Sequence, residues 1–276
     1  MTYAAVMVSL ALDGTNETRL EIVGQLAERF DAGVIGITAA QISPPLYFTA
    51  GEQAEAMLDQ RQAPSRKRIT ELEAQFGAAM QTRARAVEWR SAEDIPVRTI
   101  AREARAADII VTGQDGEEAL ADPFKQANPS DLVIQVGRPV LVVPEAGNWL
   151  DLRSILVAWK DTPEARRAIV DALPMLRKAK DVTVVEIVED DVDRPAAMSG
   201  VNDVVTWLSH HGVLATEQVH SECGHAGAEL ERIASEVGAG LIVAGAYGHS
   251  RFREWILGGV TKRLVNPLGR CSLLSR

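Results

Sequence analysis

The sequence is poor in features that mark secreted, metal-binding or membrane proteins. It has only two cysteines, Cys223 and Cys271, which are too few for a disulfide framework and too far apart for a paired metal motif. No apolar run reaches the roughly 20 residues that a membrane-spanning helix needs. The opening residues, MTYAAVMVSLALDGT, lack the basic segment and the cleavage site of a secretory signal. The sequence therefore predicts a cytoplasmic protein that does not enter a membrane.

Positive charge is also scarce. The chain has 29 basic and 38 acidic residues, which give a formal net charge of −9. Nucleic acids and anionic membranes bind proteins that present extended basic surface, so this balance argues against both as partners. Apolar residues, by contrast, are abundant. They make up 46% of 276 positions, which is enough for two domains with packed cores.

Several catalytic motifs are missing. The Gly-Lys-Ser/Thr ending of a Walker loop is absent, because Lys262 follows Thr261 instead of preceding it. No Gly-x-Gly-x-x-Gly of a dinucleotide-binding turn follows the first expected strand of either half. His249 has no accompanying nucleophile elbow, and metal-ligand spacing is absent at Cys223, His210, His211, His220 and His225. We therefore predict no catalytic residue, no metal ligand, no dehydrogenase activity and no fast phosphoryl transfer.

The chain contains an internal repeat of alternating strands and helices. Residues 3–12, followed by Asp-Gly-Thr, correspond to residues 153–159, followed by Lys-Asp-Thr. Each half continues with four further apolar runs typical of buried strands, at 33–39, 86–90, 108–113 and 139–143, and at 182–188, 215–220, 241–245 and 272–274. Alternation of this kind predicts an α/β fold with parallel sheets flanked by helices. Residues 144–151 resemble a linker, and we place the domains at 1–147 and 148–276.

One segment has no counterpart in the second half. Residues 51–85 are charged and helical in pattern, with apolar residues three and four positions apart at Ile69, Leu72, Phe76 and Met80. Two structures remain open: one long surface helix, or a helical hairpin broken at Pro64. Its charged residues are expected to form a solvated face.

A glycine-rich loop follows the apolar run that ends at Gly245. Gly248, Gly258 and Gly259 come next, and a helical pattern through Leu264 follows them. Glycines let the backbone approach an anion closely, and the start of a helix presents free N–H groups to it. Residues 245–263 carry four basic side chains and one acidic one, against the sign of the whole chain. The sequence therefore predicts a phosphate-binding loop at the carboxyl end of this strand.

The spacing Gly245-x2-Gly248-x9-Gly258 resembles the nucleotide-binding motif of universal stress proteins, in which Ser or Thr follows the last glycine. Gly259 takes that place here, and Thr261 could supply the missing hydroxyl. The resemblance implies two tandem Rossmann-like domains of the adenine nucleotide alpha hydrolase type, each a five-stranded parallel sheet. It also implies ATP or a related adenine nucleotide, with or without Mg²⁺, in the second domain of a stress sensor or regulator. The residues expected to bind it are Ala158, Lys160, Asp161, Val188, Gly245, Gly248, His249, Ser250, Arg251, Gly258, Gly259, Val260 and Thr261.

The two halves retain different parts of this family's site. The family's nucleoside-contacting Asp at the end of the first strand matches Asp13 in the first half and Lys160 in the second. After Gly113 the first half carries carboxylates, among them Glu117 and Asp122, where phosphates would lie, so we predict a structural role for it. In the second half, Asp161 could replace the missing Asp, Lys160 could approach phosphate, or Lys160 could simply face solvent.

Two other functions stay open beside nucleotide sensing. The first is a protein that has lost its ligand and acts through protein contacts, as Gly259 and Lys160 suggest. The second is a weak metal-dependent nucleotidase that uses Ser250, Arg251 and a carboxylate-bound Mg²⁺, with ATP hydrolysis slow at most. The resemblance further implies that the last strands of the two domains pair across a pseudo-two-fold axis. We also predict that whole chains form a homodimer.

Overall fold

The computed structural model describes residues 2–41, 52–114, 122–147, 149–221, 226–247, 263–265 and 269–276. Ten strands form one sheet: β1 Ala5–Ser9, β2 Gly33–Ala39, β3 Val87–Ala92, β4 Ile109–Gly113, β5 Val140–Val143, β6 Ser154–Trp159, β7 Asp181–Val188, β8 Ala215–Ser221, β9 Leu241–Gly245 and β10 Cys271–Ser275. The helices are α1 Glu17–Phe30, α2 Glu52–Met80, α3 Pro96–Glu103, α4 Pro129–Gln135, α5 Pro163–Leu176, α6 Arg194–His210 and α7 Ala226–Glu236, with short 3₁₀ turns η1 Ala104–Ala106 and η2 Asp191–Asp193. Two halves of alternating strands and helices are confirmed.

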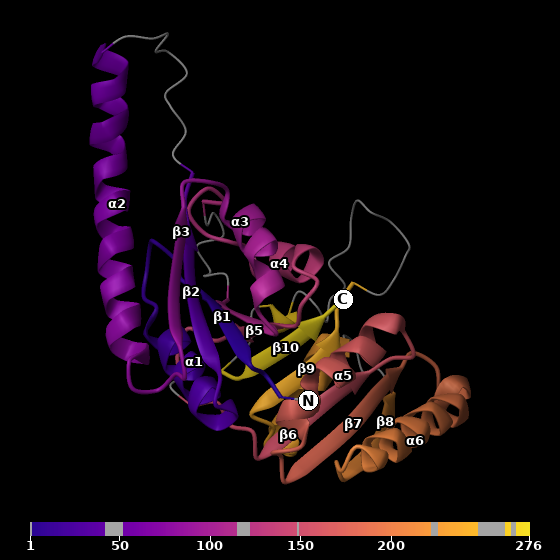
Figure 1. Cartoon of the computed structure of the whole chain (residues 1–276). Coiled ribbons are helices and arrows are strands. Elements are labelled where there is room, and N and C mark those ends of the chain that lie inside the picture. Colours follow the sequence, from indigo (N-terminus) through magenta and orange to yellow (C-terminus); the bar gives the residue numbers. More distant parts are fainter. Residues whose placement is uncertain are drawn as a thin grey trace.

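The sheet runs in the order β3-β2-β1-β4-β5-β10-β9-β6-β7-β8 (Figure 1). Within each half all neighbouring strands are parallel, as predicted. The halves join where β5 and β10 pair antiparallel, with Leu273 opposite Leu141, which confirms the pairing expected of the last strands. The carboxyl ends of β5 and β10 therefore point toward opposite edges of the sheet.

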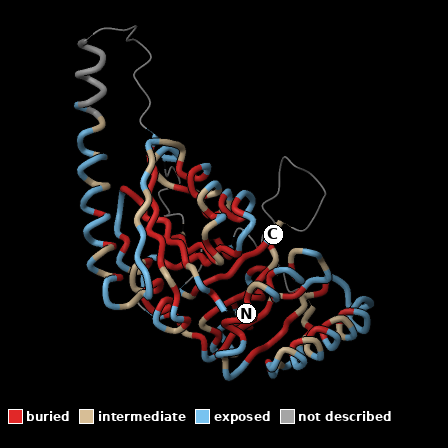
Figure 2. Tube along the Cα trace, in the orientation of Figure 1, coloured by how far each residue is buried: buried red, intermediate tan, exposed pale blue. Residues whose placement is uncertain are grey.

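Burial follows the position of each strand in the sheet. The central strands β4 and β5 are buried along their whole length, because helices cover both of their faces. The outermost strands β3 and β8 expose several residues. Figure 2 shows the buried residues concentrated in the strands and on the inner sides of the helices.

Helices cover both faces of the sheet. One face packs against α1, α2, α5 and α6, and the other packs against α3, α4 and α7. Helix α5 illustrates the sequence pattern that produces this packing. Its buried residues Ala165, Ala168, Ile169, Ala172 and Leu173 recur at intervals of three and four, which places them on one side of the helix.

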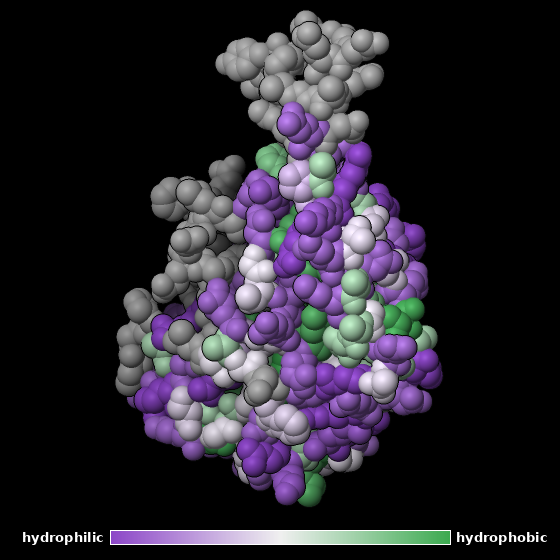
Figure 3. Space-filling view, turned by 90° about the vertical axis from the view of Figure 1, so that its left-hand side faces the viewer, coloured by the Kyte–Doolittle hydropathy of each residue, from purple (hydrophilic) through white to green (hydrophobic). Residues whose placement is uncertain are grey.

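The segment without a counterpart is a single helix, so the hairpin alternative is wrong. Helix α2 continues through Pro64, which is exposed, while Leu72, Phe76 and Met80 are fully buried under the sheet face. Figure 1 shows α2 running beside β3 and continuing past the end of the sheet. Figure 3 shows that the surface on this side is mostly hydrophilic. None of the helices in the described ranges is long and apolar enough to cross a membrane.

Helix α1 holds the segment that connects the halves. The Thr18 hydroxyl donates to the Glu145 carbonyl at 2.9 Å, and the backbone N–H of Leu150 donates to the Gln25 side chain at 2.9 Å. The Arg29 guanidinium donates to the Leu150 carbonyl at 2.6 Å and lies over the Trp149 ring. These contacts fix the connection between β5 and β6, where we predict the domain boundary near residue 148.

Candidate functional site

The described residues of the predicted site lie along one edge of the second half. Ala158 is in β6, Val188 ends β7 and Gly245 ends β9, and these are neighbouring strands. Lys160 and Asp161 follow β6 directly at its carboxyl end. The other predicted residues lie outside the described part of the chain: Gly248, His249, Ser250, Arg251, Gly258, Gly259, Val260 and Thr261.

Gly245 lies directly against the first turn of α5. A Cβ atom added there would stand 2.4 Å from the backbone nitrogen of Ala165 and 2.7 Å from the carbonyl carbon of Glu164. The helix starts at this point because Thr162 caps it, accepting a hydrogen bond from the Ala165 N–H at 3.3 Å, and because Pro163 occupies its first position. The positive end of the helix dipole therefore lies next to the strand that precedes the glycine spacing.

The structure bears on the alternatives for Lys160 and Asp161. The Asp161 carboxylate pairs with the guanidinium of Arg166 on α5. Asp161 is therefore bound to its own helix in this structure rather than taking the place of a nucleoside-contacting Asp. Lys160 is exposed, and its ammonium is close enough to influence the carboxylate of Glu186. Of the three alternatives, this arrangement favours an exposed Lys160 at the mouth of the site.

The predicted equivalence of Asp13 and Lys160 stays a prediction, and the loops that carry the two residues differ in length. Val8 of β1 pairs with Val111 of β4, and Val157 of β6 pairs with Val243 of β9. Because Gly113 and Gly245 end the corresponding strands β4 and β9, Val8 corresponds to Val157, and Ser9 to Ala158. Residues 10–15 lie between Ser9 and Asn16, the residue that precedes α1. Only residues 159–161 lie between Ala158 and Thr162, the residue that precedes α5. The first loop is thus three residues longer, and Asp13 lies in its extra length, paired with Lys125 at 3.3 Å.

The corresponding edge of the first half is filled by an arginine. Gly113 ends β4 as Gly245 ends β9, but a Cβ added to Gly113 would meet the Arg19 guanidinium at 2.3 Å. Arg19 is only 9% exposed and donates to the Ser9 carbonyl and to the Asn16 side chain. The Arg19 side chain therefore lies between α1 and β4. At the equivalent position of the second half, the backbone of β9 contacts the backbone of α5 directly. The arrangement is consistent with the structural role that we predict for the first half.

Sequence reasoning missed two carboxylates at the second edge. Glu186, two residues before the end of β7, is half-buried, and burial raises the pKa of its carboxyl group, with the Lys160 charge lowering it and Asp161 raising it further. Glu164, in the first turn of α5, has a side-chain oxygen that is fully buried and makes no hydrogen bond within the described structure. The signal for Glu186 was present in the sequence, as a single acidic residue among the apolar residues of Val182–Val188.

Glu186→Gln is expected to raise the free energy of unfolding at pH 7. Because the pKa of Glu186 is raised in the folded state, the wild-type protein loses stability as the pH rises from the ordinary Glu value, about 4.3, through the folded-state pKa. The side-chain amide of the variant does not ionise, so the variant does not lose this stability. Urea unfolding of both proteins at pH 7.5 and pH 4 would test it: the difference should be present at the higher pH and shrink at the lower one. A wild-type protein that is more stable at pH 7.5 would contradict the prediction.

The histidines and cysteines that the structure describes take part in ordinary packing. His210 ends α6 before Gly212, as predicted, and the His211 ring packs on Trp207. His220 contacts Gln218 at 3.0 Å, and burial raises the pKa of the Cys271 thiol to about 12. Among the described residues no group of three or more potential ligands is arranged to hold a metal ion. Cys223 and His225 lie outside the described ranges.

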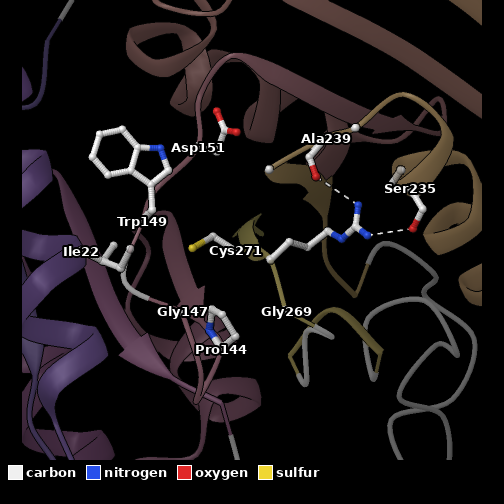
Figure 4. A pocket seen from close by; sticks show the side chains of 13 residues that line it. Ile22, Pro144, Gly147, Trp149, Asp151, Ser235, Ala239, Gly269 and Cys271 are labelled. Carbon is white, nitrogen blue, oxygen red and sulfur yellow. Dashed lines mark hydrogen bonds between the residues drawn. The ribbon is translucent and has the colours of Figure 1, made fainter.

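A cavity of about 430 Å³ lies at the join between the halves, away from the predicted nucleotide site (Figure 4). Trp149 and Asp151 of the connecting segment line one side, and Arg270 lines the other. The Arg270 guanidinium donates to the Ala239 carbonyl at 3.0 Å and to the Ser235 hydroxyl at 2.9 Å. These bonds tie the residues before β10 to the end of α7, so we assign Arg270 a structural role.

Comparison with known proteins identifies the class. Residues 152–268 match the universal stress protein family. A universal stress protein from Archaeoglobus fulgidus has a similar structure, with a TM-score of 0.71 and 14% identity over 99% of this chain and 98% of the other. A protein of unknown function from Pseudomonas aeruginosa matches with a TM-score of 0.61 and 16% identity, covering 99% of this chain and 92% of the other. No curated protein matches the sequence significantly.

The fold and its comparisons define an α/β protein built from two tandem Rossmann-like halves. The likeness to the universal stress protein family covers residues 152–268, which make up most of the second half of the chain.

Proposed function

We propose that this protein binds ATP or a related adenine nucleotide at the carboxyl edge of its second half and acts as a sensor or regulator in a stress response. The match of residues 152–268 to the universal stress protein family supports the stress role. The observation that supports the site is the contact of Gly245 with the first turn of α5, which brings the positive end of a helix to the strand that precedes the glycine spacing. Ligands of open α/β sheets bind at this edge, where neighbouring strands lead to helices on different faces.

The experiment is equilibrium binding of ATP to the full chain by isothermal titration calorimetry, with and without Mg²⁺. The wild-type protein should bind about one ATP per chain, because Arg19 fills the edge of the first half. The double variant Gly248→Ala, Gly258→Ala should lose at least tenfold in affinity with its fold retained, because added methyl groups obstruct close approach of phosphate to the backbone. Circular dichroism would check the fold, and Gly77→Ala is the matched control, because a methyl group added at this position inside α2 of the first half would meet no atom within 4 Å.

Either of two results would contradict this proposal and favour another function. Absence of ATP binding, together with no adenine nucleotide in mass spectra of the gently purified protein, would favour a protein that acts through protein contacts. Sustained Mg²⁺-dependent release of phosphate from ATP would favour the weak nucleotidase. The pairing of Asp161 with Arg166 makes the second result less expected, since this carboxylate beside the proposed site is already engaged by a guanidinium.

A further inference from the structure

Glu186 stands at the edge where the proposed nucleotide binds. Strand β7 is the neighbour of β6, and Glu186 lies opposite Trp159, the last residue of β6. Its side chain therefore shares a face of the sheet with Trp159, one residue before Lys160 along the adjoining chain. Val188, a predicted site residue, ends the same strand two positions further on. Glu186 is thus placed beside the proposed ligand without belonging to the glycine loop.

The Glu186 carboxylate is unpaired within the described part of the chain. It makes no hydrogen bond or ion pair with another described residue, although two charged groups, Lys160 and Asp161, lie near enough to influence it. Two other shielded carboxylates are paired: Glu103 with Arg90 at 2.7 Å and Glu229 with Arg232 at 2.5 Å. A half-buried carboxylate without a partner lowers stability, because it has lost part of its hydration without gaining a hydrogen bond.

The chemistry of the group indicates which part of a nucleotide it would contact. An ionised carboxylate only accepts hydrogen bonds, and it repels phosphate. Hydroxyl groups are suitable donors, and a nucleotide carries them on its ribose. In dinucleotide-binding α/β folds an acidic residue that follows the first βα unit accepts a hydrogen bond from the ribose 2′-hydroxyl. Glu186, on the second strand of the second half, provides a carboxylate in a comparable place.

We propose that Glu186 accepts hydrogen bonds from the ribose hydroxyls of the bound nucleotide and thereby gives the site its preference for ribonucleotides over 2′-deoxyribonucleotides. This inference rests on the proposed nucleotide site. Lys160 contributes by favouring the ionised carboxylate, which is the stronger acceptor. Glu164 is not suited to the same role, because its unpaired oxygen is buried away from solvent.

The test compares ATP with 2′-deoxy-ATP by calorimetric titration of the full chain at pH 7.5. The wild-type protein should bind ATP about tenfold more tightly than 2′-deoxy-ATP, since a hydrogen bond to a charged acceptor is lost with the hydroxyl. In Glu186→Ala the ratio should fall to about one, mainly through weaker ATP binding. The matched control is Asp181→Asn, which removes an exposed carboxylate from the other end of β7 and should keep the wild-type ratio.

The outcomes separate this inference from the proposed function. Equal binding of both nucleotides by the wild-type protein would overturn the role of Glu186 while leaving the nucleotide site in place. The same holds if Glu186→Ala keeps the preference for ATP. If neither nucleotide binds the wild-type protein, the proposed function fails and this inference fails with it. The wild-type comparison does not depend on whether the variant folds.

Discussion

Leu273→Ala is expected to lower the free energy of unfolding by about 3 kcal/mol, within the range observed for large-to-small changes at fully buried sites. Leu273 is 0% exposed and lies in β10, in the middle of the ten-stranded sheet. It pairs with Leu141 of the first half, which is also 0% exposed. The cavity left by the change would loosen the join, so both halves should lose stability together. Urea unfolding followed by circular dichroism would measure the loss.

Hydrogen exchange would show whether the effect reaches both halves. Amide protons of β4 and of β9 should exchange faster in Leu273→Ala by similar factors, because the sheet is continuous across β5 and β10. Val170→Ala on α5 is a suitable control: Val170 is 39% exposed, and its loss should change stability by less than about 1 kcal/mol. If amide exchange became faster only in the second half, the stability of the two halves would not be coupled through β5 and β10.

Gly245→Ala is expected to lower stability by about 2 kcal/mol and to weaken ATP binding at least tenfold. The added methyl group would collide with backbone atoms of Glu164 and Ala165, so the first turn of α5 must move away from the sheet. That movement would displace the helix end that the proposed site uses. Urea unfolding would measure the first effect, and calorimetric titration with ATP would measure the second.

Gly113→Ala is the matched control at the equivalent position of the first half. There the methyl group would meet the guanidinium of Arg19, the far end of a flexible side chain, and not the backbone. A smaller loss of stability and unchanged ATP affinity are therefore expected. If Gly245→Ala left both quantities unchanged, the first turn of α5 would not be the base of the nucleotide site. Equal losses of affinity in the two variants would point to a site in each half.

The strands were predictable because their sequence pattern is local. Strands β2 and β9 have the predicted bounds, and the others differ from prediction by a few residues at their ends. Short apolar runs bounded by glycine or charge can be recognised without knowing what packs on them. The helix at residues 52–80 was ambiguous at Pro64, and packing decided it. Leu72, Phe76 and Met80 bury one side of a single continuous helix against the sheet.

The correspondence between loop residues of the two halves was harder to predict from the sequence. The motif at Asp13 and the residues at Lys160 resemble each other in sequence, yet the loops that carry them differ in length by three residues. Sequence similarity alone cannot detect this difference, since register is set by the hydrogen bonds between strands. The glycine loop from Gly248 to Thr261 was found from its spacing and charge, and its ligand role stays a prediction.

By itself the sequence determined the class of fold and the division into two halves, and it predicted the edge at which a phosphate would bind, because strand patterning and glycine spacing are properties of short segments. Tertiary structure decided which charged groups meet at each edge. It placed Arg19 over Gly113, paired Asp161 with Arg166 and left Glu186, beside Lys160, without a partner among the described residues. Such pairings depend on where separate strands and helices come together in space, and a linear pattern does not contain those distances.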